Sequence, residues 1–104
     1  MLMATLHLVN RSPLESRALE QCLARAGEGD AVLLIENGVY AAVKGADSEA
    51  VLKSVVGRVR FYALGPDLDA RGVEASEVGE TIRIVDYGGF VDLTADYRPI
   101  QSWS

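Results

Sequence analysis

Cys22 is the only cysteine of this 104-residue chain and therefore its only thiol for nucleophilic or redox chemistry. Helical periodicity places it on an apolar stripe between Leu19 and Leu23, where free cysteine usually packs as a small hydrophobic side chain. It also falls in the second half of the expected helix, where the helix dipole raises a thiol pKa. The pattern favours a buried, unreactive thiol, although exposure and a lowered pKa would make it a nucleophile.

Five further side chains have types that can perform acid–base or binding chemistry. His7 alternates with leucines in an apolar segment, which favours a core or interface histidine over a base. Asp67, Asp69 and Arg71 lie in one short helical segment, and Asp86 follows an apolar strand. Paired carboxylates can do acid–base work, but Asp67 and Asp86 also occupy positions typical of helix N-termini. We expect structural roles for both.

Ser12 opens a segment that matches the capping-box pattern. Pro13 would take the first helical position, and Glu15 follows the serine at the spacing of the reciprocal acidic residue. This pattern predicts that Ser12 caps a helix and is not a nucleophile. The turn before it contains no glycine, which excludes a glycine-rich phosphate cradle there.

Charge and hydropathy exclude several classes of protein. The chain has 10 basic and 15 acidic residues, a net charge of −5, and 49% hydrophobic residues. The absence of a basic footprint argues against direct nucleic-acid binding. No apolar run approaches the roughly 20 residues that span a bilayer. The amino terminus lacks signal-peptide features, and one cysteine suits a reducing compartment, so we expect a cytoplasmic protein that does not bind membranes. One histidine and one cysteine, far apart, argue against a zinc site, and we expect no cofactor.

Apolar runs alternate with helical patterns along the chain. Asn37 and Gly38 are compatible with a hairpin turn, but a short helix or irregular turn is favoured after the second run. Alternation of this kind predicts one α/β domain over residues 1–104, with a mostly parallel sheet and helices on both faces. The expected strands are 4–9, 31–36, 59–64 and 81–85; the expected helices are 12–27, 47–57 and 65–72, with a last helix capped by Asp86.

Several segments together resemble the DsrH/TusB family, with a closer likeness to DsrH. The resemblance implies a DsrE-like fold, which is a small Rossmann-like sheet. The likeness extends over almost the whole chain, and the segments that carry it are the first strand running into Ser12, then 29–42, 62–72, 85–94 and 101–103.

The resemblance also implies a function and partners. Such chains are non-autonomous subunits of a cytoplasmic sulfurtransferase heterohexamer that passes persulfide sulfur between cysteines. The implied partners are DsrE/TusD-like and DsrF/TusC-like sister subunits and a DsrC/TusE-like sulfur carrier. The main sulfur-accepting cysteine is expected on a sister subunit.

Cys22 bears on the choice between two pathways. Members of the branch that oxidises stored sulfur tend to carry a cysteine in the first helix, which Cys22 matches. This match favours sulfur oxidation and makes Cys22 a candidate sulfur-carrying thiol, against the packing argument. The alternatives are a TusB-like subunit in 2-thiolation of the tRNA wobble uridine and a purely structural interface subunit.

Overall fold

The computed structural model describes residues 4–104, so the first three residues of the predicted domain lie outside the described part. Its centre is a five-stranded sheet in which every neighbouring pair is parallel. The strand order is β4-β3-β2-β1-β5. The strands are β1 (Leu6–Val9), β2 (Ala31–Leu34), β3 (Arg60–Leu64), β4 (Ile82–Val85) and β5 (Ile100–Trp103).

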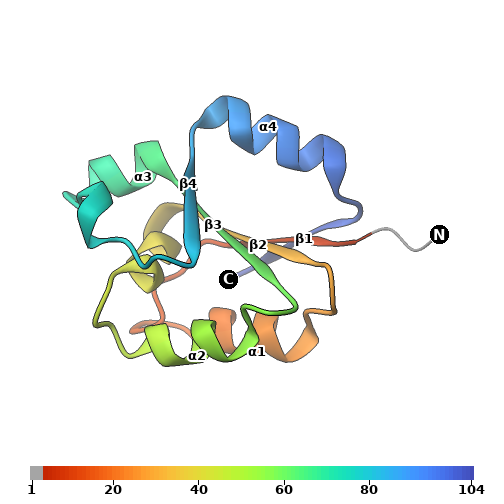
Figure 1. Ribbon diagram of the computed structural model, residues 1–104, viewed down its shortest axis with the longest axis horizontal. Helices are drawn as coiled ribbons and strands as arrows, with labels where there is room; N and C mark the ends of the chain where they lie inside the picture. The colour runs from red at the N-terminus through yellow and green to blue at the C-terminus, as the bar shows by residue number, and fades with distance from the viewer. Residues whose placement is uncertain (1–3) are drawn as a thin grey trace.

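Helices cover both faces of this sheet, as the alternating pattern predicts. Figure 1 shows α1 and α2 together on one face and α4 on the other, with α3 near one end. The helical elements are α1 (Ala18–Arg25), the 3₁₀ helix η1 (Glu36–Ala42), α2 (Ser48–Val55), α3 (Gly65–Ala70), the 3₁₀ helix η2 (Ala75–Glu77) and α4 (Tyr87–Asp96).

The apolar core is divided into two parts by the sheet. Side chains of a strand alternate between faces, so Val32 and Leu34 pack with α1 and α2, whereas Ala31 and Leu33 pack on the other side with Leu93 of α4. All four positions of β2 are fully buried. This explains why the strand is a continuous apolar run, as in sheets covered on both faces.

The predicted capping box at Ser12 is wrong. The Ser12 carbonyl accepts hydrogen bonds from the backbone N–H groups of Glu15 and Ser16, at 3.0 and 3.1 Å, and this closes a separate turn. The helix begins only at Ala18, whose N–H donates to the Ser16 hydroxyl at 3.1 Å. The turn leaves Leu14, expected on the buried stripe, 88% exposed.

Two other helix ends differ from expectation in their caps. Asp47 precedes α2 as predicted, but its side chain caps nothing and its backbone is already helical. Gly27 does not end α1, because Ala26 holds the cap position with extended backbone. The N–H of Gly27 instead donates to the Asp30 carboxylate.

The segment after β2 is helical. The sequence favours a short helix or irregular turn here over a hairpin turn at Asn37 and Gly38. Gly38 lies in η1 directly against the carbonyl of Val9, and any Cβ at this position would collide with that backbone. Only glycine therefore allows η1 to approach the carboxyl end of β1. Strand β5 was not predicted at all. It pairs with β1, and its residues lie more than 90 positions away from those of β1 in sequence.

Candidate functional site

Cys22 lies in the core beneath the sheet. Its side chain is fully buried in α1 among the apolar side chains of the α1–α2 face. Burial raises the pKa of the Cys22 thiol to about 12, and the negative charge of Asp30 adds to the rise. The thiolate, which is the reactive form, is therefore disfavoured in the isolated folded chain. The sulfur-carrying role of Cys22 stays a prediction.

Ser12 is buried and takes part in its own turn. Its hydroxyl oxygen accepts a hydrogen bond from the N–H of Leu14 at 3.2 Å. This is a local side-chain-to-backbone bond of the kind that serine forms in turns. Ser12 therefore has a structural role, as expected, but it stabilises this turn and does not cap a helix.

A polar cluster lies where β2 and β3 end. The Asp67 carboxylate accepts a 2.6 Å hydrogen bond from the N–H of Glu36. Arg71 donates from Nε to the Asn37 side-chain oxygen at 2.8 Å and from Nη1 to the Asp67 carbonyl at 3.1 Å. The structure thus brings together Asp67 and Arg71, which the sequence singled out, and joins both to the segment that follows β2.

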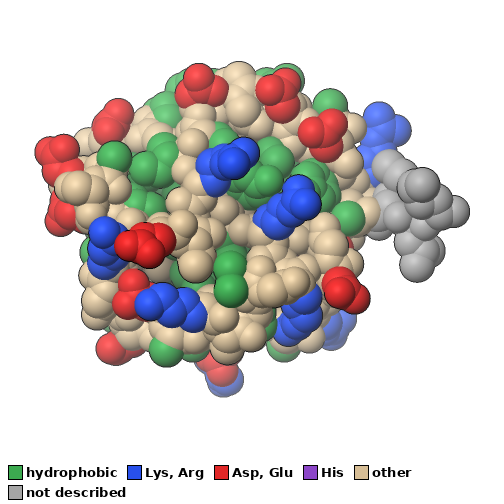
Figure 2. All heavy atoms as spheres, in the orientation of Figure 1, with side chains coloured by type: hydrophobic (Ala, Val, Ile, Leu, Met, Phe, Trp, Pro, Cys, Tyr) green, Lys and Arg blue, Asp and Glu red, His purple; other side chains and the backbone are tan. Residues whose placement is uncertain are grey.

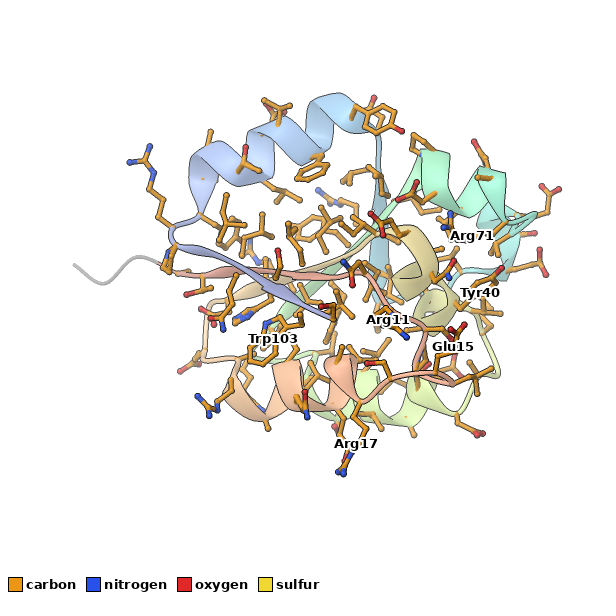
Figure 3. All side chains as sticks on the ribbon, turned by 180° about the vertical axis from the view of Figure 1, so that it is seen from behind. Arg11, Glu15, Arg17, Tyr40, Arg71 and Trp103 are labelled. Carbon is orange, nitrogen blue, oxygen red and sulfur yellow. The ribbon has the colours of Figure 1, made fainter. Side chains whose placement is uncertain are left out.

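Glu36 has strained backbone geometry at this edge of the sheet. Its φ is +50°, and it is the one non-glycine residue of the described range in the left-handed region. Such outliers persist where surrounding contacts fix them, and here the hydrogen bond to Asp67 does so. Arg11, Tyr40 and Arg71 lie at the same end of the molecule in Figure 3.

The strand order makes this edge the expected place for a ligand in a doubly wound sheet. Strands β2 to β4 extend to one side of β1 and β5 lies on the other, so the order reverses at β1. Asn10 follows β1 directly, and its buried side-chain oxygen has no hydrogen-bond donor among residues 4–104. Arg11 next to it is exposed. Together with the Asp67–Arg71 cluster, these residues are the candidate binding edge.

The remaining acidic candidates do not join this cluster. Asp86 caps α4 as predicted, because its carboxylate accepts a 2.8 Å hydrogen bond from the N–H of Gly89. Asp69 is exposed and forms no side-chain hydrogen bond or ion pair within the described residues. No paired-carboxylate arrangement for acid–base work is built from these residues.

His7 is the centre of a buried polar chain that the sequence did not predict. Its Nε2 lies 2.8 Å from the Asp30 carboxylate, and its Nδ1 accepts a hydrogen bond from the Trp103 indole N–H at 3.0 Å. His7 is only 3% exposed. Asp30 and Trp103 lie 23 and 96 positions from His7 in sequence, so no local pattern indicated the contact.

The partners of His7 determine the tautomer of its neutral ring. An indole N–H can only donate, so Nδ1 must be the acceptor and the proton of the neutral ring resides on Nε2, facing Asp30. Burial by itself would raise the pKa of Asp30, but the hydrogen bonds from His7, Gly27 and Thr5 outweigh it and lower that pKa. With both ring nitrogens occupied, His7 has no free lone pair for a substrate. It is a structural histidine, in agreement with the core or interface role expected for it.

The described range has neither a metal-binding cluster nor a membrane-spanning helix. Within residues 4–104, no three histidine, cysteine or acidic side chains gather in a way that would hold a metal ion. None of the helices in this range is both long enough and apolar enough to cross a membrane.

Comparison with known proteins identifies relatives over nearly the whole chain. The family model described as "DsrH like protein" matches residues 11–100. The Protein TusB of Pectobacterium parmentieri is 33% identical over 98 residues, covering 94% of this chain and 99% of the relative. The Protein TusB of Escherichia coli K12 is 36% identical over 100 residues, with the same coverage.

Solved structures with the same fold have little sequence in common with this chain. The crystal structure of the ychN protein from E. coli superposes with a TM-score of 0.81 at 14% identity, over 97% of this chain and 99% of that one. A solution structure of protein Tm0979 from Thermotoga maritima gives a TM-score of 0.64 at 23% identity, over 88% and 91%. These two likenesses establish the small Rossmann-like fold.

Proposed function

This chain belongs to the DsrH-like family, and from that membership we propose that it is a TusB-like subunit of a cytoplasmic sulfur-relay complex. In this proposal the complex passes persulfide sulfur toward 2-thiolation of the tRNA wobble uridine. The chain supports the complex through its surfaces and does not carry the sulfur. The observation that carries the proposal is similarity to TusB proteins over 94% of the chain.

The state of the thiol supports a role without sulfur transfer. Cys22 is the only cysteine, it is fully buried, and its raised pKa keeps it protonated at neutral pH. A persulfide would add a second sulfur atom to a closely packed core, where added volume is destabilising. In this proposal the sulfur-accepting cysteine lies on a DsrE/TusD-like sister subunit, as the family resemblance implies, and a DsrF/TusC-like subunit and a DsrC/TusE-like carrier are the other partners.

Oxidation of stored sulfur is the second candidate function. The sequence favoured it because Cys22 lies in the first helix, as in members of that branch. The relatives named TusB favour the tRNA pathway instead. The oxidative route requires Cys22 to become accessible in a complex, and this requirement separates the two candidates experimentally.

The decisive experiment replaces the relay subunits of E. coli. This chain is expressed with its own sister subunits and carrier in a strain that lacks the endogenous ones, and 2-thiouridine in tRNA is measured by mass spectrometry. We expect thiolation to be restored, and to be lost when this chain alone is omitted. If thiolation proceeds equally without this chain, or is not restored with the complete set, the proposed pathway is wrong.

Variants of Cys22 test the role within the complex. Cys22→Ala should leave thiolation unchanged, because the thiol is packing material in this proposal. The assembled wild-type complex, supplied with a sulfur donor, should show no added sulfur on this chain by mass spectrometry. An added sulfur atom that is absent in Cys22→Ser would identify Cys22 as a carrier and favour the oxidative candidate.

A further inference from the structure

A cavity of about 420 Å³ opens at the amino ends of β3 and β4, the sheet edge opposite the candidate binding edge. Arg60 is the first residue of β3, Arg83 is the second residue of β4, and Thr81 immediately precedes β4. Arg60, Tyr62, Thr81 and Arg83 are the polar lining, and the other lining residues are Val56, Val59 and Phe61. The cavity therefore combines two cations with two hydroxyl groups.

The two arginines project from neighbouring strands to the same face. Tyr62 pairs with Arg83 in the β3–β4 register, and Arg60 lies two positions before Tyr62, so all three share the face covered by α4. Figure 2 shows basic side chains beside a hydrophobic area below α4 on this side of the molecule.

Neither arginine is neutralised. Among residues 4–104, no carboxylate lies within 4.0 Å of the guanidinium of Arg60 or Arg83, and no acidic residue lines the cavity. Both side chains are exposed. A chain with a net charge of −5 thus has an uncompensated positive site at the amino ends of β3 and β4. The site is suited to carboxylate oxygens, because arginine binds carboxylates through paired N–H donors.

Tyr62 contributes a hydroxyl group to the cavity lining, and Tyr97 lies next to Tyr62 beneath α4. Tyr62 and Tyr97 both pack against the smaller core part beneath α4. Burial raises the pKa of Tyr97, the neighbouring Tyr62 adds to the rise, and Arg60 opposes it. The Tyr97 hydroxyl therefore keeps its proton at neutral pH, and the residue brings no negative charge near Arg60.

Strand β4 also has a free edge beside the cavity. It is the terminal strand of the sheet and pairs only with β3 within the described range. An unpaired strand edge presents backbone N–H and C=O groups that another extended chain can bind. In Figure 1, β4 lies at the front of the molecule with no helix across it.

We propose that the free side of β4 binds an extended acidic segment of a partner protein. The backbone of this segment pairs with β4, and its carboxylate enters the cavity between Arg60 and Arg83. Cross-strand neighbours set the expected pattern, with an acidic side chain beside Arg83 and an apolar or β-branched one beside Val85. The proposal does not rest on the relay function, since it is argued from the β4 edge and the cavity alone.

A peptide fits these features better than a nucleic acid does. The free edge of β4 supplies backbone hydrogen bonds that match a peptide and not a phosphate chain. The net charge of −5 opposes a long polyanion, because nucleic-acid affinity depends on neutralising many phosphates. Two arginines are enough for one carboxylate.

The test uses fluorescence anisotropy to measure binding of a labelled, capped hexapeptide with one glutamate flanked by threonines. A threonine then stands two positions from the glutamate on the same face of the peptide strand, as the pattern requires. We expect saturable binding, and at least roughly tenfold weaker binding to the double variant Arg60→Gln/Arg83→Gln, which corresponds to about 1.4 kcal/mol. Arg17→Gln is the matched control, because Arg17 is an exposed arginine that immediately precedes α1 and does not line the cavity, and this variant should bind as wild type does. Thermal melting checks that each variant is folded.

Three further ligands test separately the contributions of the peptide's charge, of its backbone N–H groups and of the type of polymer. A threonine–glutamine hexapeptide should bind at least roughly tenfold more weakly, and backbone N-methylation of the acidic peptide should also weaken binding. Oligouridylate should not bind. The proposal is overturned if the acidic peptide does not bind, if the double variant or the glutamine peptide binds equally well, or if oligouridylate binds in its place.

Discussion

The hydrogen bonds around His7 join three distant parts of the chain inside an otherwise apolar region. Asp30 precedes β2, His7 lies in β1, and Trp103 ends β5. The chain of contacts therefore attaches the last strand to the centre of the sheet through side chains, in addition to the backbone pairing of β1 with β5. Buried polar groups are costly unless every one is satisfied, and here both ring nitrogens have partners.

We predict that the Trp103–His7 hydrogen bond contributes measurably to stability. Trp103→Phe leaves the buried Nδ1 of His7 without a donor, which should cost about 1–3 kcal/mol. Because the substitution also removes packing, a double-mutant cycle with His7→Phe isolates the bond, and we expect a coupling energy of about 0.5–3 kcal/mol. Urea denaturation measures the free energy of unfolding of wild type and of each variant. Strictly additive effects of the two substitutions would show that the bond contributes no coupling energy.

We predict that Cys22 makes stability fall at alkaline pH. Above the ordinary thiol pKa of about 8.5, the unfolded chain loses a proton that the folded chain retains up to about pH 12. The free energy of unfolding therefore decreases as the pH rises through this window, by about 1.4 kcal/mol per pH unit.

Cys22→Ala tests this dependence. At pH 7 the variant should be less stable by about 1 kcal/mol, as expected for losing a small buried group, and Cys22→Ser by more, because it buries a hydroxyl. By pH 10 wild type should have lost about 2 kcal/mol that the alanine variant retains, so the order of stability reverses. Parallel pH curves for the two proteins would mean that the thiol is accessible and titrates normally in the folded state.

At the scale of elements, local signals predicted those structures that local contacts determine. The four apolar runs and the Asp86 cap of α4 agree with the structure, because burial on both faces and a single carboxylate–backbone bond are properties of a few adjacent residues. The predicted start of α1 was wrong because the sequence around Ser12 is compatible with two local structures. The same serine that can cap a helix can also close a turn.

The remaining differences come from contacts far apart in sequence. Strand β5 has mostly exposed residues and no continuous apolar run, so only its pairing with β1 defines it. The contacts between Asp67 and Glu36 and between Arg71 and Asn37 span 31 and 34 positions. The sequence identified Asp67 and Arg71 as candidates but could not identify what they contact.

We predict that Asp86→Ala destabilises the protein by about 1 kcal/mol, since it removes the one side-chain N-cap of α4. Asp69→Ala is the matched control, because Asp69 is exposed and unpartnered in the described range, and its effect should stay within about 0.5 kcal/mol. Thermal or urea unfolding measures both. Equal losses for the two variants would mean that the cap contributes nothing specific.

At the scale of the molecule, the single helix α4 covers one sheet face, whereas α1 and α2 share the other. Within residues 4–104, the smaller core part beneath α4 includes four buried side chains. Apolar side chains remain exposed on α4 itself: Tyr87 is 61% and Val91 is 64% exposed. These two lie four positions apart and therefore share one side of the helix. A chain of this size leaves a relatively large share of its surface uncovered.

We therefore predict that the chain associates with its sister subunits more strongly than with itself. Co-expression with the DsrE/TusD-like and DsrF/TusC-like subunits, followed by size-exclusion chromatography with light scattering, should give one larger species that contains this chain.

Val91→Glu introduces a charge on the exposed side of α4, where no packing is lost. A reduced yield of that larger species at unchanged thermal stability would therefore assign the contact to α4. Assembly that tolerates Val91→Glu would place the contact elsewhere, and a stable monomer that ignores both partners would contradict the prediction. Because the isolated chain is measured in the same way, self-association is distinguished from assembly by the mass and composition of the species.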